Sequence, residues 1–267
     1  MSIAFIAVIV ALLYLAAAGL QLSNALQHQG SLSRAGLIIA FFALAFHGVV
    51  TWHNLFDDDG IDLGFFRIFS LLFLAVNYVC VAALTRRPLQ NLLIVLFPLS
   101  AVAVLIATLG PETIRGQQAV PLGVALHIGS SVVAYAMLTL AAIQAALLAA
   151  QDQQLKRRQM GGLLGVLPPL QLMESMLFEL IWVGVVALTV SIGSGVVFME
   201  DIFAQHLVHK TVLSIVAWIL FTVLLWGRHR RGWRSQVAVR LTLSGFLLLM
   251  LAFLGSKLVL ELLLERG

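Results

Sequence analysis

Long apolar runs separated by short polar segments recur along the whole of this sequence. A helix that crosses a bilayer needs about 20 mainly apolar residues, because the membrane interior offers no water to satisfy an unpaired backbone. The sequence reaches this length eight times. We therefore expect an all-α, polytopic membrane helix bundle that forms a single integral membrane domain over residues 1–267. Its predicted transmembrane helices lie at about 3–26, 33–54, 62–84, 90–109, 121–150, 173–198, 209–227 and 236–263.

The composition excludes an ordinary soluble domain. Charged residues make up 10% of the chain and hydrophobic residues 61%, whereas a soluble domain carries about 25% charged residues. The net charge of +4 does not indicate a nucleic-acid partner, because the basic residues lie in short loops between apolar runs. The single cysteine, Cys80, lies inside an apolar run, which excludes a disulfide framework and CxxC redox chemistry.

The charge of the loops alternates along the chain and predicts the orientation. Short loops rich in Lys and Arg remain on the cytoplasmic side of a membrane. The loops after the first, third, fifth and seventh helices, with the adjoining helix ends, hold eleven of the sixteen basic residues: Arg34, Arg86, Arg87, Lys156, Arg157, Arg158, Arg228, Arg230, Arg231, Arg234 and Arg240. The alternate loops hold the acidic residues Asp57, Asp58, Asp59, Asp62, Glu112, Glu200 and Asp201. We therefore expect a multi-pass membrane protein with both termini on the outer side and with the acidic loops on the periplasmic or extracellular side.

Four of the seven histidines are expected in the outer third of the membrane. His47 lies about seven residues before the outer end of the second predicted helix, and His127 about six residues after the outer start of the fifth. At a rise of 1.5 Å per residue, both lie about 10 Å below the outer boundary. His53 and His209 lie at the boundary itself. Ionisable groups inside a membrane are energetically expensive, so these histidines are candidate functional residues.

Imidazole chemistry allows several roles for this group of histidines. Two neutral imidazoles, one on each face, complete the coordination of haem iron, and imidazole also suits zinc or a proton relay. No HExxH motif is present, so hydrolytic zinc chemistry is disfavoured. His127 is the main candidate ligand of haem iron, with His47, His53 or His209 as the second. The alternative is structural, since a histidine in a membrane often only hydrogen-bonds a neighbouring helix.

The second half of the sequence contains segments typical of one family of membrane proteins. These segments are LHIGSSVVAYAML (126–138), LPPLQLMESMLFELIWVG (167–184), the Ser194-Gly195 step, HKTVLSIVAWILF (209–221), RGWRSQ (231–236) and LTLSGFLLLMLAFLGSK (241–257). In them the chain resembles the CcsA/CcmC superfamily, whose members carry haem to cytochrome c assembly, and within it the YpjD- or HemX-like branch. The resemblance implies a haem site open to the outer side, with His127 at the position of an axial histidine.

The chain departs from the family pattern in three places. The tryptophan-rich loop that forms the haem platform in the family is missing, since no Trp lies between Glu200 and His209. The two other histidine positions of the family fall at Trp226 and near Leu264. The resemblance therefore implies the fold of the family, while its haem ligands are carried over only at His127.

These patterns lead to three functional hypotheses. The first is a haem-binding or haem-handling protein related to cytochrome c biogenesis, whose partners are the bilayer, haem and a membrane assembly partner. The second is a non-enzymatic membrane scaffold or accessory subunit that has lost haem transfer, which the missing tryptophans favour. The third is a transporter, which is disfavoured because Pro98 alone interrupts a predicted span. No motif of enzymatic catalysis is present in the sequence.

Overall fold

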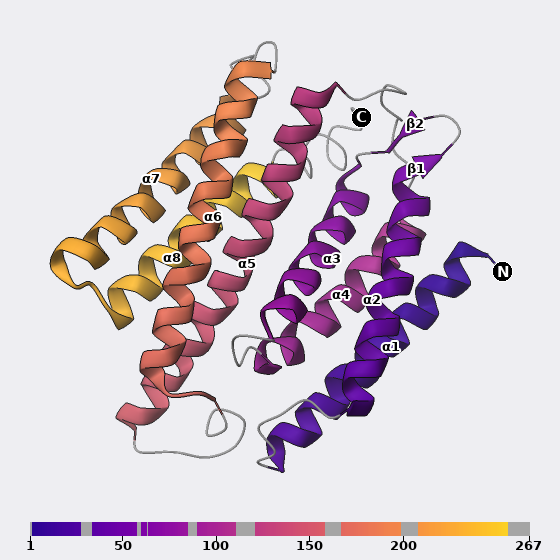
Figure 1. Cartoon of the computed structure of the whole chain (residues 1–267), viewed down its shortest axis with the longest axis horizontal. Helices are drawn as coiled ribbons and strands as arrows, with labels where there is room; N and C mark the ends of the chain where they lie inside the picture. The colour runs from indigo at the N-terminus through magenta and orange to yellow at the C-terminus, as the bar shows by residue number, and fades with distance from the viewer. Residues whose placement is uncertain are drawn as a thin grey trace. The chain divides into compact units, whose positions relative to one another are not determined.

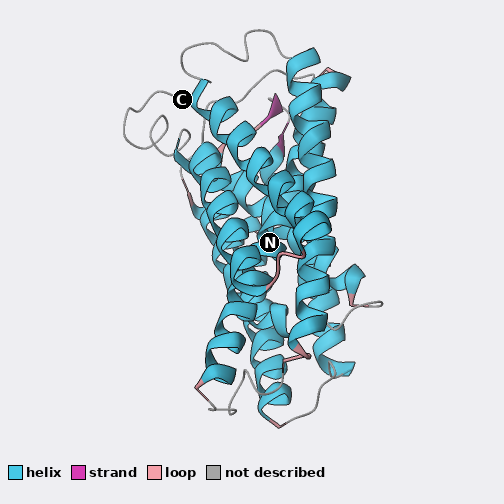
Figure 2. Ribbon diagram, turned by 90° about the vertical axis from the view of Figure 1, so that its left-hand side faces the viewer, coloured by secondary structure: helices cyan, strands magenta, loops and turns pink. Residues whose placement is uncertain are grey.

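The computed structural model is helical over nearly all of the chain that it describes, namely residues 2–27, 34–57, 60–62, 64–84, 90–110, 121–157, 167–198 and 208–255. Within these ranges, eight helices are long and apolar enough to cross a membrane (Figure 1). Figure 2 shows two short strands as the one departure from helix and loop in the part described. The expectation of an all-α polytopic membrane protein is confirmed.

Helices α1 to α4 form the first of two compact units. Their bounds are α1 Ile3–Leu26, α2 Arg34–Leu55, α3 Phe65–Ala83 and α4 Leu93–Leu109, the last preceded by the 3-10 turn η1 Gln90–Leu92. Helix α1 packs against α2 and α4, and α3 packs against the same two helices, so the four helices form a closed ring. Strands β1 (Phe56–Asp57) and β2 (Gly60–Ile61) pair antiparallel beyond the end of α2.

The packing of the first unit follows from small residues on α1. Its buried residues recur every three or four positions, which places them on one face of the helix. Alanine dominates this face, and small side chains let neighbouring helices approach closely where lipid supplies no hydrophobic drive. The buried set is Ala7, Val10, Ala11, Tyr14, Ala17, Ala18, Gln21 and Ala25.

Helices α5 to α8 form the second compact unit. Their bounds are α5 Leu122–Lys156, α6 Leu170–Phe198, α7 Val208–Arg231 and α8 Ser235–Met250, after which a π-helical turn, η3, covers Leu251–Gly255. Helix α5 packs extensively on α6 and also on α8, while α7 packs on α6 and α8. Gly184 of α6 faces Leu138 of α5 so closely that a Cβ there would lie 2.7 Å from the leucine side chain. The absence of a side chain at this position brings the two helices together.

Several helix ends differ from the predicted bounds by three residues or more: α3 begins at Phe65 instead of 62, and α7 continues to Arg231, past the predicted end at 227. Helix α5 continues six residues past the predicted end at 150, because polar residues remain helical and Lys156 pairs with Asp152 one turn earlier. Its 35 residues span about 52 Å, well beyond the hydrocarbon thickness of about 30 Å. Helix α6 begins three residues before the predicted start, directly after Pro168 and Pro169. The predicted end of the eighth helix, at 263, lies outside the described residues.

A tight turn joins α7 to α8. Gly232 adopts φ of +66°, a left-handed conformation that favours glycine at the end of a helix. The indole of Trp233 lies against Gly227, where a Cβ would come within 2.2 Å of the ring. The turn therefore depends on one glycine for its backbone conformation and on another for the space that the indole fills.

Candidate functional site

His127 lies in the second turn of α5 and faces α6. Its Nδ1 atom is 2.8 Å from the backbone carbonyl oxygen of Ser191. A carbonyl oxygen can only accept a hydrogen bond, so Nδ1 carries the proton and Nε2 keeps a lone pair in the neutral ring. Nε2 makes no hydrogen bond to any residue that the structure describes. The half-buried ring therefore has one nitrogen anchored and one available as a ligand.

A small hydroxyl network fixes the helices around this histidine. The hydroxyl of Ser131 lies 2.6 Å from that of Ser191 and 2.6 Å from the carbonyl oxygen of His127. Ser194 donates a second hydrogen bond to the Ser191 carbonyl, at 3.0 Å. Gly195 leaves room for the ring, because a Cβ at this position would lie 3.2 Å from both Cε1 and Nδ1 of His127. These contacts join α5 to α6 and set the orientation of the imidazole.

The donor set at His127 fits haem better than zinc. A structural zinc ion takes four protein ligands and a catalytic one three. Haem supplies four nitrogen atoms itself and needs one or two axial ligands from the protein. Within the described residues there is no group of three or more His, Cys, Asp or Glu side chains that could hold a metal ion. A ligating histidine usually donates its other ring N–H to a carbonyl or carboxylate, as Nδ1 of His127 does.

His47 has a different environment, in the first unit. Its side chain is fully buried, and both ring nitrogens are hydrogen-bonded. Nδ1 lies 2.9 Å from the hydroxyl of Tyr14 on α1, and Nε2 lies 2.9 Å from the hydroxyl of Ser70 on α3. Coordination of a metal by His47 would require one of these bonds to break. The observed geometry matches the structural alternative, in which the histidine connects three helices.

The other two candidate histidines lie at helix ends. His53 is exposed in the last turn of α2, beside the exposed indole of Trp52. Aromatic residues are enriched at membrane interfaces, and this pair has the character of an interface anchor. His209 is the second residue of α7 and is also exposed, in the same unit as His127. Of the remaining histidines, His229 is exposed, whereas His28 and His206 lie outside the described residues.

Sequence reasoning missed a charged cluster at the opposite end of the second unit. Glu174, near the start of α6, is nearly buried and accepts a hydrogen bond from Arg228, in the last turn of α7. Arg228 also donates to the carbonyl oxygen of Trp233, at 3.2 Å, and its guanidinium lies 4.6 Å from the ring centroid of Phe178. Nε of Arg234 lies 3.9 Å from the same carboxylate. Fifty-four residues separate the main pair, so no local spacing reveals it.

Comparisons with known proteins cover most of the chain. A sequence model of the family described as "Cytochrome C assembly protein" matches residues 1–264. The inner membrane protein YpjD of Escherichia coli strain K12 is 34% identical over 240 residues, which cover 89% of this chain and 90% of YpjD. A 28.8 kDa protein in the nifR3-like 5' region of Azospirillum brasilense is 33% identical over 196 residues, which cover 73% of this chain and 71% of that protein. No solved structure matches the chain.

Proposed function

Since this chain belongs to the cytochrome c assembly protein family, we propose that it handles haem during cytochrome c biogenesis, with His127 as an axial ligand of the iron. The observation that carries the proposal is the ring geometry of His127. Nδ1 donates to the Ser191 carbonyl, and Nε2 has no hydrogen-bond partner in the part of the chain described. Family membership and the apolar helices support a multi-pass protein of the bacterial inner membrane.

The residues around His127 prepare it for coordination. The hydrogen bond to Ser191 fixes the tautomer and makes Nε2 more basic. Ser131 and Ser194 hydrogen-bond to the hydroxyl and the carbonyl oxygen of Ser191, and so hold the acceptor of the imidazole in place. His127 would hold haem through Nε2, and bound haem would supply a redox-active iron. The chain itself contributes this ring nitrogen in a fixed orientation.

The second axial ligand is proposed to be His209. It is exposed, and it belongs to the same compact unit as His127. His53 is exposed as well, but it belongs to the first unit. His47 ranks last, because Tyr14 and Ser70 occupy both of its ring nitrogens.

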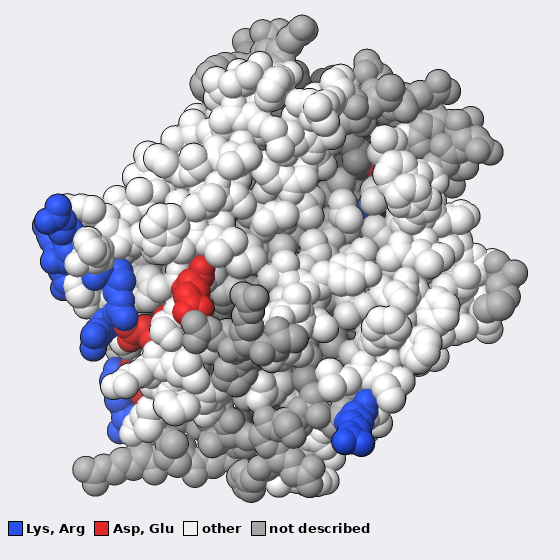
Figure 3. Space-filling model, in the orientation of Figure 1, with Lys and Arg blue, Asp and Glu red and all other residues white. Residues whose placement is uncertain are grey.

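The orientation is proposed from the charge distribution of the second unit. Figure 3 shows Lys and Arg side chains gathered around the turn between α7 and α8. The end of α5 carries further basic residues, Lys156 and Arg157. Basic ends remain in the cytoplasm. The opposite end, where α5 begins and His127 lies, is therefore assigned to the outer side.

Absorption spectroscopy of the purified full-length chain tests the haem proposal. We expect protein from haem-replete cells, or protein titrated with haem, to show a Soret band that His127→Ala strongly reduces. His229→Ala removes an exposed histidine from the basic end of α7 and should leave the band unchanged. Two results contradict the proposal: wild-type protein that is purified without haem and leaves the spectrum of added haem unchanged, or a His127→Ala spectrum identical to that of the wild type.

An accessory subunit without haem is the second candidate. It is favoured by the lack of Trp between Glu200 and His209 and by the fully hydrogen-bonded state of His47. Under this function the chain would copurify with a stoichiometric membrane partner and carry no haem. The spectrum described above, recorded on the same preparation, distinguishes the two functions.

A further inference from the structure

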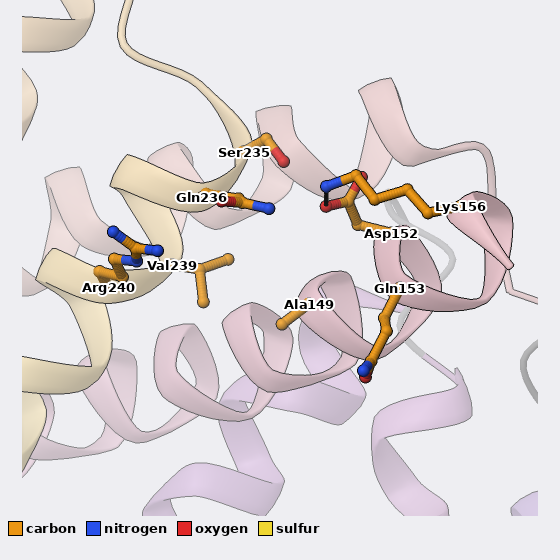
Figure 4. Close-up of a pocket in the computed structure, with 8 residues that line it drawn as sticks. All are labelled: Ala149, Asp152, Gln153, Lys156, Ser235, Gln236, Val239 and Arg240. Carbon is orange, nitrogen blue, oxygen red and sulfur yellow. Dashed lines mark hydrogen bonds and ion pairs between the residues drawn. The ribbon is translucent and has the colours of Figure 1, made fainter.

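A polar pocket lies between the last turns of α5 and the first turns of α8, both in the second unit (Figure 4). Its volume is about 320 Å³, which is ample for a phosphate group and part of the molecule that carries it. The polar lining residues are Asp152, Gln153, Lys156, Ser235, Gln236 and Arg240. Figure 4 shows Arg240 and Lys156 on opposite sides of this space, with Ser235 and Gln236 between them.

The charges of the pocket leave an excess cation. Nζ of Lys156 lies 2.6 Å from Oδ2 of Asp152, so these two charges offset each other. Arg240 is exposed and makes no ion pair with the residues that the structure describes. A guanidinium offers several N–H donors in a planar fork that matches two oxygens of a phosphate. The amide of Gln236 and the hydroxyl of Ser235 add neutral donors nearby.

The surroundings of the pocket resemble a membrane interface. Arg240 is the sixth residue of α8, about 8 Å along the helix from its first residue. Exposed apolar side chains lie on the same two helices: Val237 (41% exposed) and Leu243 (37%) lie one turn to either side of Arg240 on α8, and Leu155 (42%) precedes Lys156 on α5. A cation beside such side chains at the end of a spanning helix is placed to meet a headgroup while acyl chains cover the apolar surface.

We propose that this α5–α8 pocket binds the phosphate group of an anionic phospholipid, with Arg240 as the principal cation and Lys156 as the second. The proposal is independent of haem binding, because the pocket lies at the opposite end of α5 from His127. Free phosphate shares the same chemistry, and the exposed apolar flank favours the lipid as its source.

The experiment compares two double variants that lose the same charge. Arg240→Gln with Lys156→Gln removes both cations of the pocket. Arg157→Gln with Arg230→Gln removes two exposed cations of the same end that do not line the pocket. Binding of phosphatidylglycerol to the full-length chain in neutral detergent is measured by native mass spectrometry, with phosphatidylcholine and excess inorganic phosphate as separate arms.

If only diffuse attraction between charges acts, each basic residue removed should lower the affinity for phosphatidylglycerol by about fivefold, and the two double variants should lose equally. A built site predicts a further loss of about tenfold in the pocket variant alone. Ala149→Phe fills the pocket without changing its charge and should also weaken binding, although its folding must be verified by thermal unfolding. Binding of phosphatidylcholine as tight as that of phosphatidylglycerol would contradict a site for an anionic lipid.

Two results overturn the proposal. Equal losses in the two double variants would show that only the general basic charge of this end attracts the lipid. Inorganic phosphate that displaces phosphatidylglycerol completely, at matching affinity, would show that the lipid contributes nothing beyond its phosphate.

Discussion

The buried carboxylate of Glu174 allows a direct measurement of what holds the basic end of the second unit together. Its side chain is 8% exposed, and that of its partner Arg228 is 30% exposed. Glu174→Gln keeps the volume and one acceptor oxygen, so it loses only the difference between a charged and a neutral hydrogen bond, about 1 kcal/mol. Glu174→Ala leaves the guanidinium of Arg228 without its carboxylate acceptor. Removing one partner of a buried pair costs about 3–5 kcal/mol, and partial hydration of Arg228 favours the lower limit.

A double-mutant cycle isolates the interaction between the two side chains. Glu174→Ala, Arg228→Met and the double variant are unfolded by titration with a denaturing detergent in mixed micelles, and the coupling energy is taken from the four free energies of unfolding. We expect a coupling energy of about 2 kcal/mol. Arg228→Met also removes the contacts of Arg228 with Trp233 and Phe178, but it does so whether or not Glu174 is present, so their contribution cancels in the cycle.

The matched control is the exposed pair of Asp152 and Lys156 on α5. These side chains are 22% and 58% exposed and lie one helical turn apart. Pairs of this kind contribute about 0.3–0.5 kcal/mol. A coupling energy for Glu174 and Arg228 no larger than that of the control would refute the reasoning that burial makes this contact structurally important.

Two further substitutions separate structure from ligand binding. Tyr14→Phe leaves a ring nitrogen of the buried His47 without its partner and should destabilise the chain by about 1–2 kcal/mol in detergent unfolding. Tyr78→Phe is its control, since that hydroxyl is 3.5 Å from its acceptor on a half-exposed side chain; equal losses would contradict the role of His47. Gly195→Ala places a Cβ 3.2 Å from the imidazole of His127 and should lower haem affinity about tenfold without loss of thermal stability. Gly193→Ala has open space and should retain the affinity in haem titrations; an undiminished affinity in both variants would argue against a precisely oriented ring.

The hydrophobic pattern predicted the eight spans because the bilayer imposes a length on each of them. Where the pattern was wrong, polar residues were the cause. Helix α5 runs on through the polar segment that ends at Lys156, whose pairing with Asp152 supports the helix outside the apolar run. The start of α6 was placed three residues late, although Pro168 and Pro169 mark it. Hydropathy indicates which residues can lie in the membrane, whereas the length of a helix is set by how far its backbone hydrogen bonds continue.

The sequence assigns each histidine an expected depth in the membrane, but it does not indicate the direction in which the side chain faces. His47 and His127 were placed at similar depth, and both were considered as ligands. In the structure both ring nitrogens of His47 are hydrogen-bonded, to Tyr14 and Ser70, whereas Nε2 of His127 makes no hydrogen bond to the described residues. The difference arises from the rotation of each helix about its axis and from partners on other helices. The hydropathy of a single sequence indicates neither the rotation of a helix about its axis nor its partners on neighbouring helices.

The acceptor that orients His127 belongs to the backbone and not to a side chain, and this has a genetic consequence. Ser191→Ala removes a hydroxyl but retains the carbonyl oxygen to which Nδ1 donates. A small residue at 191 therefore keeps this hydrogen bond, whereas a large one would push against Ser131 of α5, whose hydroxyl lies 2.6 Å from that of Ser191. Random mutagenesis for loss of the orientation should recover Gly195→Ala, whose Cβ meets the ring, but not Ser191→Ala. The position that supplies the contact thus tolerates the loss of its side-chain oxygen, while the position that leaves room for the ring does not tolerate one added carbon.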